Sequence, residues 1–192
     1  MLEKLPASLG RALRRARPGA AELVINDEAL ADVPDCITVT SPAFGEGDPL
    51  PMRFTADGEG VSPPLQWSGI PEGAVELALL IEDADSPTPN PLVHAIVWQL
   101  PPGDGGLDEG VMPRSTDRVT SPAMGVNSFL RIGYLPPDPP PGHGLHRYAF
   151  ELFALRAPLM IETDAPGRAE LVAVLHAYAI AKGMLIGTYE RD

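Results

Sequence analysis

The sequence contains one cysteine, Cys36, among 192 residues. A single chain therefore cannot form an internal disulfide or a zinc site built on several thiolates, and a reducing compartment suits it, so we expect a cytoplasmic protein. Apolar runs of the roughly 18 residues that a membrane-spanning helix needs are missing, so we expect no transmembrane segment. Basic residues are scarce too, because 14 Lys and Arg face 26 Asp and Glu, for a formal net charge of −12. Such a charge repels phosphate backbones, so no nucleic-acid partner is expected.

Proline and glycine, in contrast, are abundant, with 23 Pro and 19 Gly spread between apolar runs. This interleaving is typical of a chain with many turns rather than of a low-complexity tract, so we expect short strands more than long helices. The length suits one domain, and a composition of 44% hydrophobic and 21% charged residues is enough to bury a core. The composition therefore predicts a globular domain that is mainly β.

The start of the chain differs from the rest in charge and periodicity. Its basic residues are Lys4, Arg11, Arg14, Arg15 and Arg17, against Glu3 alone. Its apolar residues recur at helical spacing before Pro18 and Gly19, namely Leu2, Leu5, Leu9, Leu13 and Ala16. We therefore predict a short amphipathic helix, and we separate an arm with its linker, residues 1–36, from a main domain over residues 37–192.

The arm has several possible roles. Arginines interrupt its apolar runs, so it does not match a secretory signal. Its composition resembles an organelle transit peptide or a membrane-surface helix, which leaves peripheral membrane contact open, but the favoured interpretation is an arm packed on the acidic body or on a second subunit. An apolar face that needs cover, with positive charge beside an acidic body, favours a homodimer.

Beyond the arm, short apolar segments alternate with turn residues. Their patterns predict strands over residues 37–40, 52–55, 76–82, 93–100 and 147–155. The third and fourth of these are apolar in their middle, which is typical of strands buried on both faces. Residues 103–146 are expected to be mostly loop, and residues 168–182, which lack Pro and Gly, are expected to form a helix that Gly183 ends. Connections this short and rich in proline disfavour repeated βαβ units and favour an antiparallel β domain.

Two polar clusters could carry chemistry. The first has Asp83 and Asp85 at the end of a predicted buried strand, then Pro87, and then His94 within the next strand. Carboxylates in this place need a cation, a donor or a metal, although each aspartate could instead cap the turn through backbone N–H groups. His94 lies between apolar residues and, taken alone, is interpreted as a core histidine.

The second cluster is a proline-rich loop that leads into a predicted strand and contains His143 and His146. Proline fixes φ and removes backbone donors, so this loop is predicted to form a stiff wall. An interpretation as a PxxP ligand for SH3-type modules is disfavoured, because such ligands lie in disordered polar surroundings and this loop is flanked by an apolar strand.

Several motifs of the chain occur in an order that one protein family shares. They are T-S-P-A-F at 40–44, S-P-P-L-Q-W at 62–67, D-A-D-S-P at 83–87, His94 in its strand, the run 133–150, and G-T-Y at 187–189. On these motifs the chain resembles the phosphatidylethanolamine-binding proteins, in their bacterial Raf-kinase-inhibitor-like branch. The resemblance covers about residues 37–191, and several independent motifs in order are more specific than any one of them.

The resemblance implies a fold and a site. The fold would be a large antiparallel sheet packed against a smaller one, with a C-terminal helix and an anion-binding pocket at the strand ends. By position, the pocket residues would be Asp83, His94, His146 and Tyr148, with a rim of Asp85, Pro87, Asp138, Pro139 and Pro140. Imidazole and hydroxyl groups can donate to phosphate oxygens, and a carboxylate can meet an ammonium group. The implied function is non-enzymatic binding of a small anionic ligand or a phospholipid headgroup, which could modulate a partner protein.

The chain departs from the family pattern near the pocket. Leu92 and Ala95 replace aromatic residues beside His94, so the aromatic wall is thinner. Asp138 stands where a small residue or Cys is usual, and its carboxylate would repel a phosphate unless it were protonated or turned outward. Arg147 precedes Tyr148 along a predicted strand and is therefore expected to face the other side of the sheet.

Two other classes of function stay open. Asp83, His94 and His146 match, by residue type, a two-histidine one-carboxylate metal site, and such a site would suit a metal-dependent enzyme. Against it, no serine or cysteine has the sequence context of a nucleophile, and we expect neither a cofactor nor a metal. The second alternative is a protein-interaction module, such as a kinase or protease inhibitor, that uses the arm and the proline loop.

Overall fold

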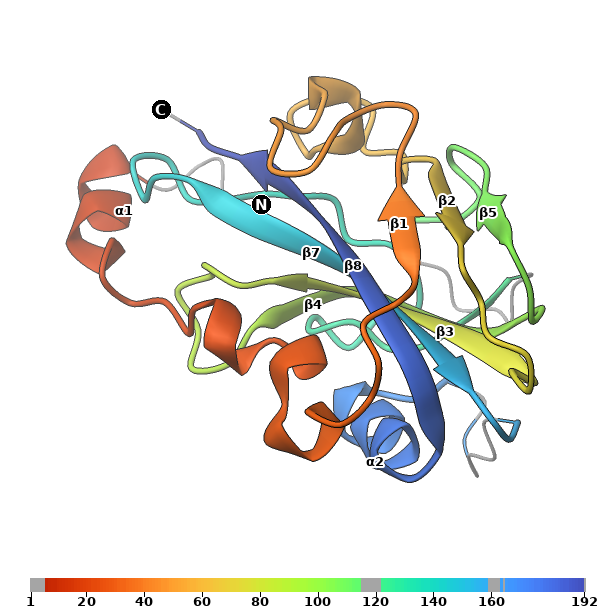
Figure 1. Ribbon diagram of the computed structural model, residues 1–192. Helices are drawn as coiled ribbons and strands as arrows, with labels where there is room; N and C mark the ends of the chain where they lie inside the picture. The colour runs from red at the N-terminus through yellow and green to blue at the C-terminus, as the bar shows by residue number, and fades with distance from the viewer. Residues whose placement is uncertain (1–5, 115–121, 159–162, 164, 192) are drawn as a thin grey trace.

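In a computed structural model, which describes residues 6–114, 122–158, 163 and 165–191, the chain forms two antiparallel sheets (Figure 1). The larger has the order β6-β4-β3-β7-β8 and the smaller the order β1-β2-β5. The strands are β1 Thr38–Thr40, β2 Leu65–Ser68, β3 Glu76–Asp83, β4 Leu92–Leu100, β5 Gly105–Leu107, β6 Ala123–Met124, β7 His146–Leu155 and β8 Ala179–Tyr189. The predicted antiparallel β fold is therefore confirmed.

Helices are short in the described part of the chain. The α-helices are α1, Ala7–Leu13, and α2, Arg168–Tyr178. Single 3₁₀ turns cover Ala20–Glu22, Val24–Asn26, Glu28–Leu30 and Met52–Phe54. No helix among the described residues is both long and apolar enough to cross a membrane.

The large sheet is buried on both faces. In β3, Leu79 and Ile81 belong to a core between the two sheets, whereas the alternate residue Leu80 belongs to a second core on the opposite face. Val24 of the N-terminal segment and Leu175 of α2 complete that second core. Figure 1 shows the resulting layers, with the small sheet on one side of the large sheet and α2 with the 3₁₀ turns of residues 20–30 on the other. Burial on both faces explains why β3 and β4 are apolar without strict alternation.

One predicted element is wrong, and another is too long. Residues 52–55 form a 3₁₀ turn instead of a strand, because Thr55 bonds back to Met52 through both its amide (3.0 Å) and its hydroxyl (2.8 Å). The predicted helix over residues 168–182 ends at Tyr178, and β8 follows directly. Gly183 lies inside that strand, where a Cβ atom would collide with the carbonyl oxygen of Ile37. This glycine therefore permits a close backbone approach and does not end a helix.

The predicted arm helix is shorter and packs differently. Leu2 and Leu5 lie outside the described residues, and Leu9 is 42% exposed, so the predicted apolar face is wrong at that position. The buried residue of α1 is Gly10, whose missing side chain lets the helix backbone lie against the loop that contains Pro141. The helix therefore packs on the proline loop through its backbone at Gly10, and not through a row of leucine side chains.

The segment after α1 belongs to the second core. Leu23, Val24, Ile25 and Leu30 are all buried there, beneath the large sheet. The boundary at residue 36 stays a prediction, but the residues just before it cover the sheet and are not a loose linker.

Candidate functional site

Strand register brings the two polar clusters together. Asp83 ends β3 and lies opposite Leu92 of β4 on one side and Tyr148 of β7 on the other. In an antiparallel sheet, the end of one strand lies beside the start of its neighbours. His94, near the start of β4, and His146, at the start of β7, therefore lie at the same end of the sheet as Asp83. Figure 1 places α1 at the same end of the molecule, beside the start of β7.

A cavity of about 430 Å³ opens at this edge. Of the predicted site residues, Asp83, Pro87, His94, Asp138, Pro139, Pro140 and His146 line it. The other lining residues are Ala56, Ser86, Leu92, Arg114, Asn127, Phe129, Arg131, Tyr134, Leu135 and Pro136. The volume suits a ligand of the size of a headgroup.

His94 is a neutral imidazole with one nitrogen lacking a partner. Its Nδ1 lies 2.6 Å from the carbonyl oxygen of Leu135, and since that oxygen only accepts, Nδ1 carries the proton. Burial lowers the pKa of His94, although Asp83 and the bond to Leu135 act in the opposite direction. The remaining nitrogen, Nε2, is buried without a hydrogen-bond partner among the described residues and is left as an acceptor.

Tyr148, predicted as a pocket residue, is not among the residues that line the cavity, but its ring packs against two that do, His94 and His146. Its ring is edge-on to His94, with centroids 5.2 Å apart, and stacked with His146, with centroids 6.3 Å apart. Its hydroxyl is also buried and lacks a partner within the described structure. Burial, followed by the charge of Asp83, raises the pKa of Tyr148 well above its ordinary value, so the hydroxyl keeps its proton.

The other tyrosine at the cavity, Tyr134, differs in this respect. Its hydroxyl donates to the carbonyl oxygen of Phe54 at 3.1 Å, so it holds the wall together and is not available to a ligand.

Asp83 and His146 are already paired. Oδ2 of Asp83 accepts from Nδ1 of His146 at 2.7 Å, and Oδ1 accepts from the amide of Asp85 at 2.8 Å. The second ring nitrogen of His146 lies 2.7 Å from Nδ1 of His143. A metal ion would have to displace these bonds, and among the residues described no group of three His, Cys, Asp or Glu side chains is arranged to hold one.

Asp138 lines the cavity, but its charge is compensated. Arg191 donates to its carboxylate at 2.7 Å and to the carbonyl oxygen of Pro139 at 2.8 Å. The same guanidinium also contacts Asp57 at 2.8 Å. The expected repulsion of a phosphate is therefore reduced by a residue at the far end of the chain, which sequence reasoning missed because nothing near residue 138 points to it.

Asp85 and Arg147 lie away from the cavity. Arg147 donates to both carboxylate oxygens of Asp85, at 2.7 Å and 2.8 Å, and Arg17 of the arm approaches at 3.3 Å. Asp85 is therefore not placed at the rim, because its carboxylate is occupied on the other side of the sheet. Arg147 faces away from His146 and Tyr148, as the strand alternation indicates.

The lining residues that were not predicted as site residues include Arg114, Asn127 and Arg131. They come from the region expected to be loop, which has no periodicity to place them. Asn127 fixes a tight turn, since its side-chain oxygen accepts from the amides of Phe129 (3.0 Å) and Arg131 (3.4 Å). The two arginines add positive charge to the cavity, for which the sequence predicted only His, Tyr and Asp as polar residues.

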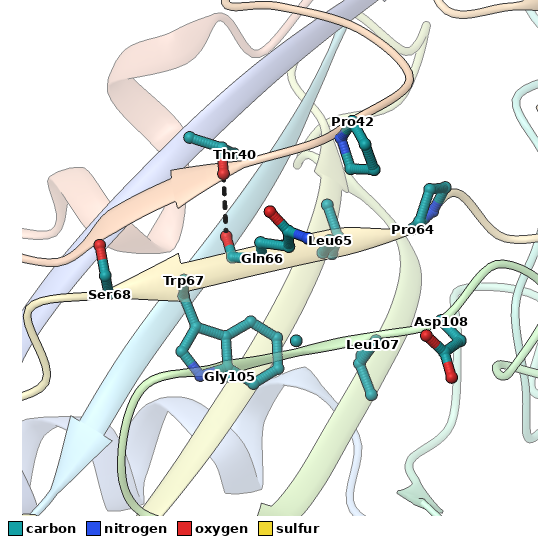
Figure 2. A pocket seen from close by; sticks show the side chains of 11 residues that line it. Thr40, Pro42, Pro64, Leu65, Gln66, Trp67, Ser68, Gly105, Leu107 and Asp108 are labelled. Carbon is teal, nitrogen blue, oxygen red and sulfur yellow. Dashed lines mark hydrogen bonds between the residues drawn. The ribbon is translucent and has the colours of Figure 1, made fainter.

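A second hollow of about 500 Å³ lies on the small sheet, over β2 and β5 (Figure 2). It is lined by Thr40, Gln66, Trp67, Gly105 and other residues of these strands, and Asp108 is its charged member. Because it lacks buried polar atoms without partners, it offers less chemistry than the cavity at the strand ends.

Fold and site together define a β-sandwich binding protein with a polar cavity at its strand ends. The family model described as phosphatidylethanolamine-binding protein matches residues 40–190. The chain belongs to the phosphatidylethanolamine-binding protein family.

Relatives and solved structures agree with this assignment. A UPF0098 protein of Methanothermobacter thermautotrophicus is 36% identical over 149 residues, which cover 78% of this chain and 95% of the relative. LppC of Mycobacterium tuberculosis, named as a candidate lipoprotein, is 38% identical over 80% of this chain and 72% of its own. The crystal structure of CT736 from Chlamydia trachomatis, described as a homologue of this family, has 34% identity and a TM-score of 0.72, covering 82% of this chain and 99% of that one. E. coli YbcL gives 28% identity and a TM-score of 0.73, covering 81% and 99%.

Proposed function

We propose that the cavity binds a small ligand that carries a phosphate and a hydrogen-bond donor, as a phosphoethanolamine headgroup does. The observation that carries this proposal is the pair of buried polar atoms without partners, Nε2 of His94 and the hydroxyl of Tyr148. A buried polar group without a partner costs about 1 to 3 kcal/mol, so a ligand that supplies both partners recovers that cost.

The two ends of such a ligand suit different walls. Arg114 and Arg131 supply positive charge for phosphate oxygens, and the hydroxyl of Tyr148 can donate to an acceptor. Neutral His94 offers a lone pair, and Asp83 offers negative charge, so an ammonium group or a P–OH group suits them. A ligand with both signs of charge therefore matches the cavity better than a fully ionised phosphate.

The site is proposed to bind without catalysis. Ser86 lines the cavity, but its hydroxyl is bonded to Thr88 at 2.6 Å. His146 has both ring nitrogens engaged, by Asp83 and by His143, and so cannot serve Ser86 as a general base. The named relatives are not described as enzymes.

Location and assembly remain predictions. The reducing compartment inferred from the lone Cys36 favours the cytoplasm, whereas one relative is named as a candidate lipoprotein. Homodimer formation stays a prediction that sedimentation velocity can test, and modulation of a partner protein follows only if ligand binding changes the surface around the cavity.

The test is calorimetric titration with phosphoethanolamine, inorganic phosphate and ethanolamine, performed on the wild type, on Tyr148→Phe and on Tyr178→Phe. Tyr178 is an exposed residue at the end of α2, so the last variant is a matched control. We expect phosphoethanolamine to bind tighter than either fragment, and Tyr148→Phe to weaken it by about tenfold, equivalent to about 1.4 kcal/mol, while Tyr178→Phe has no effect. Equal affinity in all three proteins, or no binding by the wild type, would refute the proposal.

A further inference from the structure

A continuous chain of hydrogen-bonding groups joins the N-terminal arm to the cavity wall. The carbonyl oxygen of Leu13, at the end of α1, lies 2.9 Å from Nε2 of His143. Nδ1 of His143 lies 2.7 Å from Nε2 of His146, and Nδ1 of His146 lies 2.7 Å from Asp83. Both imidazoles and the carboxylate are buried, and the last two residues line the cavity.

The number of protons in this hydrogen-bonded series can be counted from its contacts. Each of the three contacts requires one proton between its two heavy atoms, and the carbonyl oxygen of Leu13 can only accept. Two neutral imidazoles carry only two protons between them. The hydrogen-bonded series must therefore hold a third proton, in addition to these two, while α1 is docked.

The position of that proton follows from the surroundings. Burial lowers the pKa of His143, more than the carbonyl of Leu13 raises it, so His143 is the neutral member. Its Nε2–H then donates to Leu13, and its Nδ1 accepts from His146. The remaining proton therefore lies between Nδ1 of His146 and Oδ2 of Asp83, which are 2.7 Å apart in a buried pair.

Other contacts hold the arm against the same loop. Arg17 donates to the carbonyl oxygens of His143 and Leu145, each at 2.6 Å. At Gly10 a Cβ atom would collide with the carbonyl oxygen of Pro141, so the α1 backbone lies directly on the proline loop. The arm is therefore seated by its backbone, with Leu13 aimed at His143.

We propose that the arm, residues 6–19, is a proton-linked part of the binding site, whose docking keeps one more proton on the pair of His146 and Asp83 in the cavity wall. When the arm leaves, Nε2 of His143 no longer has to donate, and the chain needs one proton fewer. Docking thus takes up a proton and is favoured as the pH falls. This inference deepens the proposed function, because the additional proton in the wall strengthens the binding of an anion.

The charges that face the two imidazoles come from several elements. Asp83, on β3, bonds to His146 and also acts on His143, while His94, on β4, interacts with His146. The arm adds Arg17, which approaches Asp85, and Arg14, whose side chain lies near Gly144. Arm release would remove positive charge that lowers the pKa of His143, which favours protonation, and would also remove the Leu13 carbonyl, and the loss of this acceptor is the change that releases the proton.

The linkage can be tested on the full chain without ligand. Gly10→Val places a side chain against Pro141 and should displace α1, while Ala12→Val changes an exposed neighbouring position of the same helix. Nitrogen-15 NMR of the histidine rings at pH about 7 should show a proton on Nε2 of His146 in the wild type and in Ala12→Val, and none on that nitrogen in Gly10→Val. An unprotonated Nε2 of His146 in the wild type, or identical spectra in all three proteins, would overturn the inference.

A second pair of variants tests the same linkage without the risk that Gly10→Val fails to fold. Arg17→Gln removes the two bonds to the loop carbonyls, and Arg15→Gln removes an exposed charge of the same arm. Only the former should shift the histidine titration. If the two variants titrate alike, the arm does not control the proton.

Titration with inorganic phosphate at pH about 6 and about 8 then separates the two claims. We expect Gly10→Val to bind phosphate at least about threefold more weakly than Ala12→Val at the lower pH, with a smaller difference at the higher pH. A wild type that binds no phosphate, but whose histidine spectrum depends on the arm, would refute the proposed function and leave the linkage standing. Equal binding by both variants at both pH values would refute the role of the arm in the site.

Discussion

At the residue scale, the cavity is distinguished by which polar atoms lack partners. Tyr134 and Tyr148 are both fully buried at the site, but only Tyr134 bonds to the backbone, through the carbonyl oxygen of Phe54. Tyr148→Phe should leave the melting temperature unchanged or higher, because it removes a buried hydroxyl that has no partner. Tyr134→Phe should lower the stability by about 1 to 2 kcal/mol, because it leaves the carbonyl unpaired. Thermal unfolding of both variants checks this, and equal losses would contradict it.

The pair of Asp138 and Arg191 provides a second test at this scale. Arg191→Met removes the 2.7 Å bond to the Asp138 carboxylate and should weaken phosphate binding by about tenfold, or about 1.4 kcal/mol. Adding Asp138→Asn to that variant should restore most of the affinity, since the repulsive charge is then gone. Calorimetry on the double-mutant cycle measures the coupling, and strictly additive effects would show that the two residues act separately.

A third residue-scale test concerns two acidic residues in the second core. Glu82 and Glu151 interact there, and burial raises the pKa of both, with the charge of Glu82 raising that of Glu151 further. The amides of Val24 and Ile25 donate to these carboxyl groups at 3.1 Å and 2.8 Å, so the pair anchors the N-terminal segment.

The sign of the pH dependence follows from the raised pKa of Glu151. Its pKa is higher in the folded than in the unfolded chain, so folding binds a proton. That contribution to stability is fully present below the unfolded-state pKa and is lost as the pH rises through the folded-state pKa. Glu151→Gln keeps a donor and an acceptor without the titration, and should therefore be more stable than the wild type at alkaline pH, by about 1 to 3 kcal/mol. Chemical unfolding across the pH range tests this, and parallel profiles would contradict it.

At the scale of elements, the long apolar strands and the start of the last helix were predictable, and the end of that helix was not. The patterns of β3, β4 and β7 are long and bounded by turn residues, so the sequence predicts them to within about two residues. Residues 179–182 are equally compatible with a helix by propensity, and pairing with β7 converts them into strand. Tertiary pairing of this kind leaves no local signal, so Gly183 was assigned a wrong role.

Gly183 offers a direct test of that pairing. Gly183→Ala should destabilise the protein by about 2 to 4 kcal/mol, because a Cβ atom would push the chain at Ile37 away from β8. Gly105→Ala, in β5, is a matched control, since its Cβ atom would meet nothing nearer than the Trp67 indole at 3.7 Å. Urea unfolding compares the two, and similar losses would show that the close approach at Ile37 is unimportant.

At the scale of the whole molecule, the cavity depends on segments that are far apart in sequence. The family resemblance pointed to Asp83, His94, His146 and Tyr148, and strand register explains why the first three reach one cavity, because it brings their strand ends together. The position of Asp85 was not predictable in this way, because its carboxylate bonds to Arg147 on the opposite face of the sheet. Residues that reach the site from irregular segments, such as those around Asn127 and the C-terminal end, have no periodic pattern from which their place could be inferred.

The N-terminal segment joins these scales. Its residues up to Leu30 complete the second core, and α1 lies on the proline loop that forms one wall of the cavity. In a chain with a charge of −12, the basic Arg17 of this segment bonds to the carbonyl oxygens of His143 and Leu145, next to His146 of the cavity wall. The N-terminal segment thus contributes both to the second core and to the surroundings of the cavity.

The measurement that tests the central claim most directly is a crystal structure of the protein with phosphoethanolamine. We predict the headgroup inside the cavity at the strand ends, with a donor of the ligand within hydrogen-bond distance of Nε2 of His94 and an acceptor near the hydroxyl of Tyr148. A headgroup seated in the hollow over β2 and β5 (Figure 2), or a cavity that stays free of it at saturating concentration, would contradict the account.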